Sequence, residues 1–199
     1  RIQCFIPAQG NSPRNAPIQI SSVRTNESAL FYITYDAPST PMVISATPSS
    51  TTRPVLLNIT GSNFVLGNTS VMVGSLPCAV ITMTSTSIFC TIHANQSAGS
   101  HSIVVDVVSI GQSNANVSYW HPLKINSSSL SEGSFAGGLP VTLVGDGFLG
   151  RSVTASICNR SCNTITVTSN TELICVTPAL SQRQANETCN LTVTVDGTS

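Results

Sequence analysis

The feature that most constrains this chain is an internal repeat with a period of about 85 residues. The motif Gly-x-x-Phe at Gly61 returns at Gly145, and Cys78 returns as Cys162, both 84 residues later. A second cysteine recurs at Cys4, Cys90 and Cys175, with separations of 86 and 85 residues. A unit of this length suits a small sandwich domain that buries its own core. The chain is therefore predicted to be a string of like domains.

The best-defined copy, residues 55–90, has the pattern of β-strands joined by glycine turns. Val55, Leu57 and Ile59 alternate with less apolar residues, which is the period of a strand with one buried face. Gly61 then interrupts the pattern at a position suited to a sharp turn. Helical periodicity appears nowhere convincingly. The chain is predicted to be all-β, with each copy packing one sheet against another.

Proline-containing segments at 38–41 and 120–122 are predicted to be the domain junctions. They divide the chain into the C-terminal part of a truncated first domain (1–39), a second domain (40–121) and a third domain whose last strand is cut off (122–199). Short, stiff linkers limit the swivel between domains, so the expected assembly is a semi-rigid rod.

Two further expectations concern the ends of these domains. The strand at 29–35 is predicted to be buried on both faces near its middle. Trp120 is predicted to pack against the following domain, as aromatic residues at junctions commonly do.

Charge is scarce in this chain. Its 199 residues include eight basic and eight acidic side chains, and only 8% are charged, against about a quarter in typical soluble domains. Nucleic-acid binding is excluded because it needs clustered Lys and Arg. No apolar run reaches the roughly eighteen residues of a membrane span, and no signal peptide opens the chain. Such elements are expected outside this segment.

Glycans attached at Asn-x-Ser/Thr sequons would explain how a chain with so little charge stays soluble. Nine sequons occur, which is several times the number expected from composition. They stand at Asn26, Asn58, Asn68, Asn95, Asn116, Asn126, Asn159, Asn186 and Asn190. Most are predicted to carry N-linked glycans, which would mask apolar surface and block pairing between strand edges. The alternative is an accidental enrichment of polar surface.

The seven cysteines are predicted to form a disulfide framework. Their spacing lacks the paired C-x-x-C pattern of zinc sites. The expected bonds are Cys78–Cys90, Cys162–Cys175 and Cys158–Cys189, with Cys4 paired to a residue upstream of Arg1. Each bond within a repeat closes a loop worth roughly 3 kcal/mol of unfolded-chain entropy. Together with the sequons this favours an oxidising compartment over buried free thiols.

Residues 145–150 match the dinucleotide-binding pattern G-x-G-x-x-G literally. That motif functions only where a helix follows, because the helix N-terminus holds the pyrophosphate. Residues 152–158 have a strand pattern instead. Asn63 replaces Gly147 in the preceding repeat, which indicates a turn position that needs left-handed backbone.

No other catalytic or metal-binding constellation is predicted. Three histidines and an aspartate could be combined as ligands, but none has zinc-site spacing: His93, His101, His121 and Asp106. The histidines are expected in loops or on the surface. The carboxylates are scattered, without a paired acid and base or the cluster that calcium needs: Asp36, Asp106, Glu132, Asp146 and Glu172. The chain is predicted to be non-enzymatic and to bind no cofactor.

The order of motifs in each copy resembles the IPT/TIG domain, an immunoglobulin-like sandwich found in plexins, Met-type receptors, some transcription factors and the fibrocystins. The resemblance is carried by residues 59–64, 71–74, 77–78 and 88–90 in one copy, and by 143–148, 162 and 174–175 in the next. The extra pair Cys158 and Cys189 departs from the common pattern. With the glycan-rich copies, it looks most like the arrays of the fibrocystin/polyductin family.

This resemblance implies tandem immunoglobulin-like (E-set) β-sandwiches in the ectodomain of a very large single-pass protein at a ciliary or microvillar surface. The expected role is an extracellular spacer, adhesion segment or receptor ectodomain. Expected partners are cell-surface proteins or further copies, with no nucleic acid and no membrane insertion by this segment.

Two alternatives stay open, a plexin- or Met-like receptor stalk and a carbohydrate-binding module. Sugar binding predicts an exposed aromatic strip near Trp120. The spacer interpretation predicts that Trp120 is buried.

Overall fold

The computed structural model describes residues 14–21, 28–35, 37–49, 54–92, 95–114, 116–180 and 188–199. These residues form strands joined by turns, with one short 3-10 helix, η1 (Ala37–Ser39), so the all-β sandwich prediction is confirmed. No helix among them has the length and apolar character that a membrane crossing requires. Several predicted positions lie outside the described residues: Cys4, Asn26, Asp36, His93 and Asn186.

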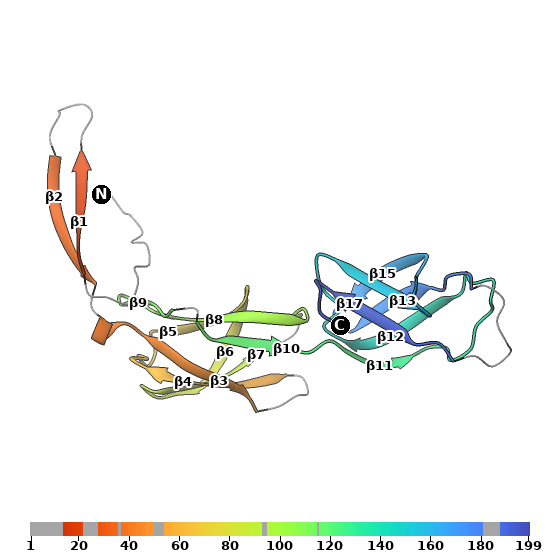
Figure 1. The fold of residues 1–199 in the computed structure, drawn as a ribbon. Coiled ribbons are helices and arrows are strands. Elements are labelled where there is room, and N and C mark those ends of the chain that lie inside the picture. Colours follow the sequence, from red (N-terminus) through yellow and green to blue (C-terminus); the bar gives the residue numbers. More distant parts are fainter. Residues whose placement is uncertain are drawn as a thin grey trace.

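A two-stranded hairpin precedes the sandwiches. Strands β1 (Arg14–Ser21) and β2 (Ser28–Tyr35) pair antiparallel, and Figure 1 shows the hairpin projecting away from the rest of the molecule. Phe31 and Tyr32 of β2 are 57% and 66% exposed. The prediction that β2 is buried on both faces is therefore wrong, because no second sheet covers the hairpin within the described residues.

The second domain has two layers connected by β6. This strand pairs with β5 at its start and with β7 along the rest of its length. One layer has the order β3-β4-β7-β6, and the other runs from β6 through β5 and β8 to β10, with β9 beside β8 (Figure 1). The strands are β3 (Met42–Pro48), β4 (Val55–Ser62), β5 (Thr69–Val73), β6 (Leu76–Met83), β7 (Ser87–Ile92), β8 (Gly99–Val107), β9 (Gly111–Gln112) and β10 (Ser118–His121).

Period-two alternation places the core of this domain. Along β4, every second residue is buried, and Leu57 and Ile59 are completely inaccessible. They meet Ile88 of β7 and Val105 of β8 from the opposite layer in one continuous cluster. Each such side chain stabilises the fold by about 1.5–3 kcal/mol.

The third domain repeats this plan with two separate sheets. One has the order β11-β12-β16-β15 and the other β14-β13-β17. The strands are β11 (Lys124–Ser128), β12 (Pro140–Asp146), β13 (Val153–Ile157), β14 (Arg160–Ser161), β15 (Thr164–Ser169), β16 (Glu172–Val176) and β17 (Leu191–Val195). Phe148, Leu143 and Leu173 are completely buried at its centre. Strand β13 follows Gly150, so the glycine-rich segment is a turn, as its repeat-mate indicated.

The repeated Gly-x-x-Phe motif has a steric cause. A Cβ on Gly61 would collide with the Met42 carbonyl and with the ring of Phe64. A Cβ on Gly145 would collide with the Lys124 carbonyl and with the Phe148 ring in the same way. In both copies glycine lets the first strand of the domain and the aromatic ring approach the backbone from two sides.

Candidate functional site

The three predicted cysteine pairs are bonded in the structure, the two that repeat and the one formed by the remaining cysteines of the third domain. Their Cα atoms lie 5.4 Å apart for Cys78–Cys90, 4.9 Å for Cys158–Cys189 and 5.7 Å for Cys162–Cys175. Cys90 and Cys175 occupy the same place in the two copies, on β7 and β16, and both are completely buried. The Cys78–Cys90 bond therefore joins β6 to β7, and the Cys162–Cys175 bond joins the segment between β14 and β15 to β16, each inside a hydrophobic core.

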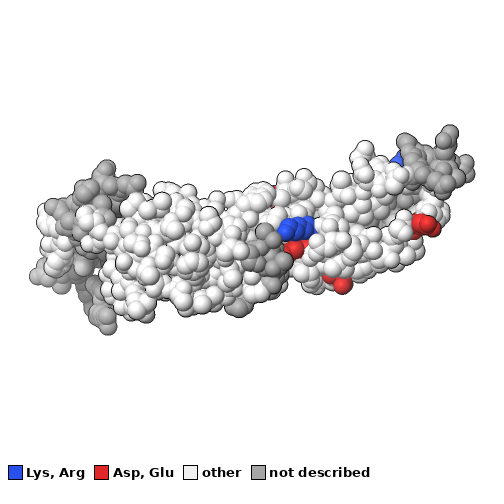
Figure 2. All heavy atoms as spheres, turned by 90° about the horizontal axis from the view of Figure 1, so that it is seen from below, with Lys and Arg blue, Asp and Glu red and all other residues white. Residues whose placement is uncertain are grey.

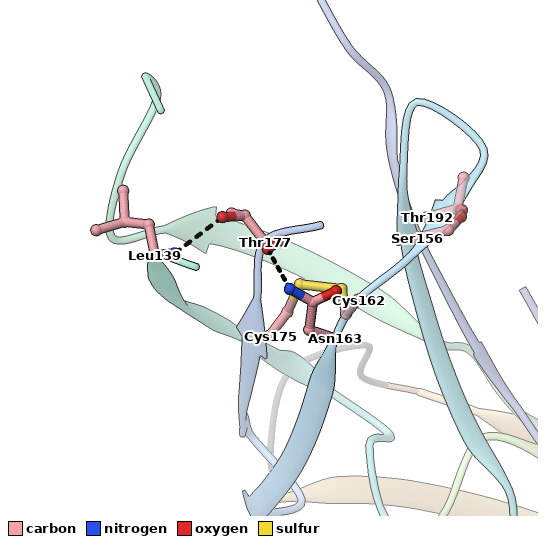
Figure 3. The surroundings of a disulfide bond; sticks show 7 residues. All are labelled: Leu139, Ser156, Cys162, Asn163, Cys175, Thr177 and Thr192. Carbon is pink, nitrogen blue, oxygen red and sulfur yellow. Dashed lines mark hydrogen bonds between the residues drawn. A yellow bond between two sulfur atoms is a disulfide. The ribbon is translucent and has the colours of Figure 1, made fainter. Parts of the chain in front are cut away.

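Polar contacts hold the chain around the Cys162–Cys175 bond (Figure 3). The Asn163 side chain donates through Nδ2 to the Thr177 carbonyl at 3.1 Å, and the Thr177 hydroxyl accepts from the Leu139 amide at 3.0 Å. These bonds join the segment before β12 to the end of β16. In the neighbouring sheet, the hydroxyls of Ser156 and Thr192 meet at 2.6 Å between β13 and β17.

The Cys158–Cys189 bond is an addition of the third domain, because the corresponding positions of the second domain are Gly74 and His101. Cys158 and Asn159 form the two-residue turn between β13 and β14, and both have positive φ, 51° and 61°. Two left-handed residues are typical of a tight hairpin turn that matches the strand twist. The Cys158 amide also donates to the Asn190 carbonyl at 3.1 Å, so the bond ties this turn to the segment that enters β17.

The described sequons lie at or near the surface. Asn58 is half-buried on β4, with its side chain on the face opposite to Leu57 and Ile59. The other six are exposed: Asn68, Asn95, Asn116, Asn126, Asn159 and Asn190. These positions leave space for glycans, and their occupancy remains a prediction.

The junction between the second and third domains differs from the sequence-based expectation. Trp120 is 57% exposed, whereas His121 is only 3% exposed. Successive residues of a strand face opposite sides, and β10 directs Tyr119 and His121 inward. The predictions of a buried Trp120 and of a surface His121 are therefore both wrong, because the alternation along β10 turns the indole outward and the imidazole inward.

His121 lies in a chain of polar contacts that crosses the junction. Its Nδ1 is 3.1 Å from the Tyr119 hydroxyl, and its Nε2 is 3.3 Å from Oδ1 of Asp146 at the end of β12. The same Asp146 oxygen accepts a bond from Asn170 Nδ2 at 3.0 Å, and Asn170 Oδ1 accepts from the Leu149 amide at 3.1 Å. The network thus runs from the core of the second domain into the third.

Backbone packing supports this contact. The Ala98 amide, in the segment before β8, donates to the Gly147 carbonyl of the third domain at 3.1 Å. Ala98 is 5% exposed and belongs to the core cluster of that domain. Gly147 has φ of 90°, and a Cβ there would lie 3.1 Å from the Ala98 Cβ. Sequence reasoning missed Ala98 and Asn170 because both are distant in sequence from the linker.

The repeat-mate of Gly147 contacts the preceding junction in a different way. Asn63 has φ of 63°, and its Nδ2 donates to the carbonyls of Pro38 and Thr40 at 2.7 and 2.8 Å. Asn63 and Gly147 thus share the left-handed backbone that was expected. Asn63 bonds to the segment that precedes its own domain, whereas Gly147 contacts Ala98 within the second domain.

The histidines and carboxylates considered as metal ligands do not come together at one site within the described residues. Among the described residues, no group of three or more His, Cys, Asp or Glu side chains is placed to hold a metal ion. His101, on strand β8, has its Nε2 2.8 Å from the Ser97 carbonyl in the segment just before that strand. Figure 2 shows that charged side chains are few on the face it presents.

Comparison with known proteins identifies the domain type. The profile of the IPT/TIG domain matches residues 41–119 and again 123–199. The chain belongs to the IPT/TIG domain family. Fibrocystin-L of Mus musculus is 27% identical over 195 residues, and Fibrocystin-L of Homo sapiens is 29% identical over 163 residues. These alignments cover 96% and 80% of this IPT/TIG chain but 4% of each relative. The predicted resemblance to fibrocystin-type IPT/TIG arrays is confirmed.

Solved structures that match this chain include the Plexin A4 full extracellular region, domains 1 to 8. Its TM-score is 0.36 at 20% identity, over 79% of this chain and 17% of that chain. The Bacteroides ovatus protein SGBP-B, solved in complex with a mixed-linkage heptasaccharide, has a TM-score of 0.32 at 16% identity, over 88% of this chain and 47% of that chain.

Proposed function

We propose that this chain is a non-enzymatic extracellular segment of a large cell-surface glycoprotein, and that it serves as a spacer, an adhesion segment or a receptor ectodomain. Two Fibrocystin-L relatives, of which the chain spans about 4%, support its place in a much longer protein. Three disulfides between buried or half-buried cysteines support an oxidising compartment.

The junction is the observation that carries the mechanical part of this proposal. Only Pro122 and Leu123 separate β10 from β11. The contacts of His121 with Asp146, and of Ala98 with Gly147, then join the two sandwiches on either side of this linker. A short linker with a packed interface restricts relative rotation, so one domain can transmit orientation and tension to the next.

Residual dipolar couplings of backbone amides test this proposal on the secreted 199-residue chain. A rigid junction predicts that one alignment tensor describes both sandwiches. Inserting Gly-Ser between Pro122 and Leu123 should split it into two tensors while leaving the fold of each domain unchanged. Two independent tensors in the unmodified chain would contradict the spacer mechanism.

The exposure of Trp120 favours carbohydrate binding as a second candidate function. Trp120 projects outward from β10, opposite Ser100 of β8, and an exposed indole can stack on a sugar ring. Glycan-array screening followed by calorimetry tests this function directly. A saccharide that binds the chain but not its Trp120→Ala variant would support it, and the absence of any bound glycan would remove it.

A further inference from the structure

The outer face of the β3-β4-β7-β6 layer carries a single aromatic side chain. Phe89 of β7 is 41% exposed, and no other aromatic residue occurs in these four strands. The register places Asn58 of β4 directly opposite Phe89, and Thr82 of β6 on its other side. Side chains directly opposite in an antiparallel pair have Cβ atoms about 4.5–5.5 Å apart. Phe89 therefore has a polar residue directly opposite it on each side, one of them a sequon asparagine, while Val80 and Ile81 at the bulge of β6 add apolar side chains that are 37% and 58% exposed.

The Asn58 amide has an orientation that suits modification. Its oxygen Oδ1 is buried and has no hydrogen-bond partner, although the residue as a whole is only half-buried. The remaining polar atom of this side chain is Nδ2, the atom that N-glycosylation modifies. With the oxygen turned inward, Nδ2 is left as the accessible end of the amide.

Thr91 supplies a second unsatisfied oxygen on the same face. It follows Phe89 by two residues on β7, is 7% exposed, and has a buried Oγ1 without a partner. Its register partner is Leu56 of β4, so Thr91 lies diagonally across from Asn58. Because both oxygens are shielded from solvent, a sugar on this face is expected to make its contact with the exposed Phe89 ring, through the apolar C–H face of N-acetylglucosamine.

The third domain provides an internal comparison. By the repeat spacing, Thr142 and Ile174 occupy the places of Asn58 and Phe89, and they face each other in the same register. Both side chains are half-buried. The sequon and the exposed ring are therefore present together in one copy and absent together from the other.

We propose that Asn58 carries an N-linked glycan whose first sugar residue lies on the Phe89 ring and covers this face of the second domain. The transfer forms a bond from Asn58 Nδ2 to the anomeric carbon. The glycosyl–phosphate bond of a lipid diphosphate donor breaks, Nδ2 loses one proton, and the lipid diphosphate leaves. The inference rests on the extracellular function proposed above. A glycan here excludes a protein partner from the centre of the same face.

Site occupancy is measured first, on the 199-residue chain secreted from glycosylating cells. Peptide mass spectrometry after amidase treatment in heavy-oxygen water should find Asn58 converted to labelled aspartate. An empty Asn58 beside occupied sequons elsewhere would overturn this inference and leave the proposed function intact. Empty sequons throughout the chain would contradict both.

Contact with the ring is measured by a double-mutant cycle using thermal unfolding of the second domain. Asn58→Gln should lower its melting temperature by about 4 °C when Phe89 is present, and by about 1 °C or less in the Phe89→Thr background. Asn68→Gln, which removes an exposed sequon of the same domain, should give equal shifts in both backgrounds. Equal shifts for Asn58→Gln as well would overturn the contact.

Enzymatic trimming identifies which sugar is responsible. An endoglycosidase that leaves a single N-acetylglucosamine on each asparagine should preserve most of the stabilisation that depends on Phe89, and complete removal by the amidase should abolish it. If trimming to a single N-acetylglucosamine already removed all of the Phe89-dependent stabilisation, the assignment of the ring contact to the first sugar would be overturned.

A spectroscopic measurement keeps the proposal testable if Phe89→Thr does not fold. In chain carrying carbon-13-labelled glycans, one N-acetyl methyl signal should show an upfield ring-current shift. That shifted signal should be absent from the Asn58→Gln variant. The presence of only unshifted signals in the unmodified chain would overturn the contact.

Discussion

At the scale of single residues, the fold depends on two glycines whose position has no room for a Cβ atom, and on a histidine whose ring makes polar contacts at the domain junction. Gly61 and Gly145 are required because backbone and an aromatic ring occupy the space of a Cβ. His121 is a polar residue held in an apolar junction by Tyr119 and Asp146. Burial of this imidazole is tolerated because its Nδ1 is hydrogen-bonded to the Tyr119 hydroxyl and its Nε2 lies 3.3 Å from the Asp146 carboxylate.

Gly145→Ala is expected to destabilise the third domain by about 1–3 kcal/mol, because the added methyl forces the Lys124 backbone and the Phe148 ring to move. Denaturant unfolding followed by the fluorescence or circular dichroism of the chain measures the change. Gly133→Ala is the matched control, since nothing lies within 4 Å of a Cβ there. Equal effects of the two substitutions would contradict the steric explanation.

His121→Ala is expected to cost about 1–3 kcal/mol, because it removes a partner from the Tyr119 hydroxyl and from Asp146 inside the junction. Trp120→Ala, on the adjacent but outward position of β10, should change stability by less than about 0.5 kcal/mol. Urea unfolding of both variants gives the comparison. A larger loss from Trp120→Ala would mean that the indole, and not the imidazole, supports the junction.

At the scale of elements, each sandwich combines an alternating core with a disulfide between neighbouring strands. The bond from β6 to β7 in the second domain corresponds to the bond between Cys162 and β16 in the third. The third domain adds Cys158–Cys189 across 31 residues of sequence. In the chain-entropy description, the longer loop gives the larger stabilisation.

Reduction is expected to lower the stability of both domains, by roughly 3 kcal/mol for each short-loop bond. Calorimetric melting with and without a thiol reductant measures this effect, with free thiols counted before and after the scan. A chelator added instead of the reductant should leave the melting temperature unchanged. A drop caused by the chelator alone would reveal a bound metal that contributes to folding.

At the scale of the whole molecule, the two sandwiches lie end to end (Figure 1), joined by a linker of two residues. Their contact combines a backbone hydrogen bond, a polar network and the insertion of Ala98 into the neighbouring core. Interfaces of this kind decide whether tandem domains act as one body or move independently.

Gly147→Asn is expected to change the relative orientation of the domains while leaving each one folded. Asparagine tolerates the left-handed backbone, as Asn63 does in the preceding repeat, but its side chain would press on Ala98. Small-angle scattering and amide dipolar couplings measure the change. Asn63→Gly, which removes two hydrogen bonds to the earlier junction, is the control and should leave the orientation of the second domain relative to the third unchanged. An unchanged orientation in Gly147→Asn would refute the role of Gly147 in setting it.

Much of the architecture could be predicted from local patterns. The period-two alternation of β4, the recurring Gly-x-x-Phe motif and the loop lengths between cysteines are properties of neighbouring residues. They therefore predicted two sandwiches, and they predicted a turn rather than a helix at Gly147, because a strand pattern follows it.

The errors occurred where burial depends on residues far away in sequence. Leu30 and Phe31 are apolar enough for a core, but their exposure depends on whether another sheet covers the hairpin. The prediction that Trp120 lies in the interface rested on the usual packing of junction aromatic residues against the next domain. The register of β10 with β8 turned it outward instead.

The amino-acid sequence alone determined the domain type, the repeat and the choice of cysteine partners, because these follow from periodicity and spacing along the chain. Only the tertiary structure decided which face of β10 meets the next domain, that Ala98 and Asn170 belong to the junction, and that Asn58 stands opposite Phe89. These are relations between strands, and they are defined only once pairing has set the register of one strand against another.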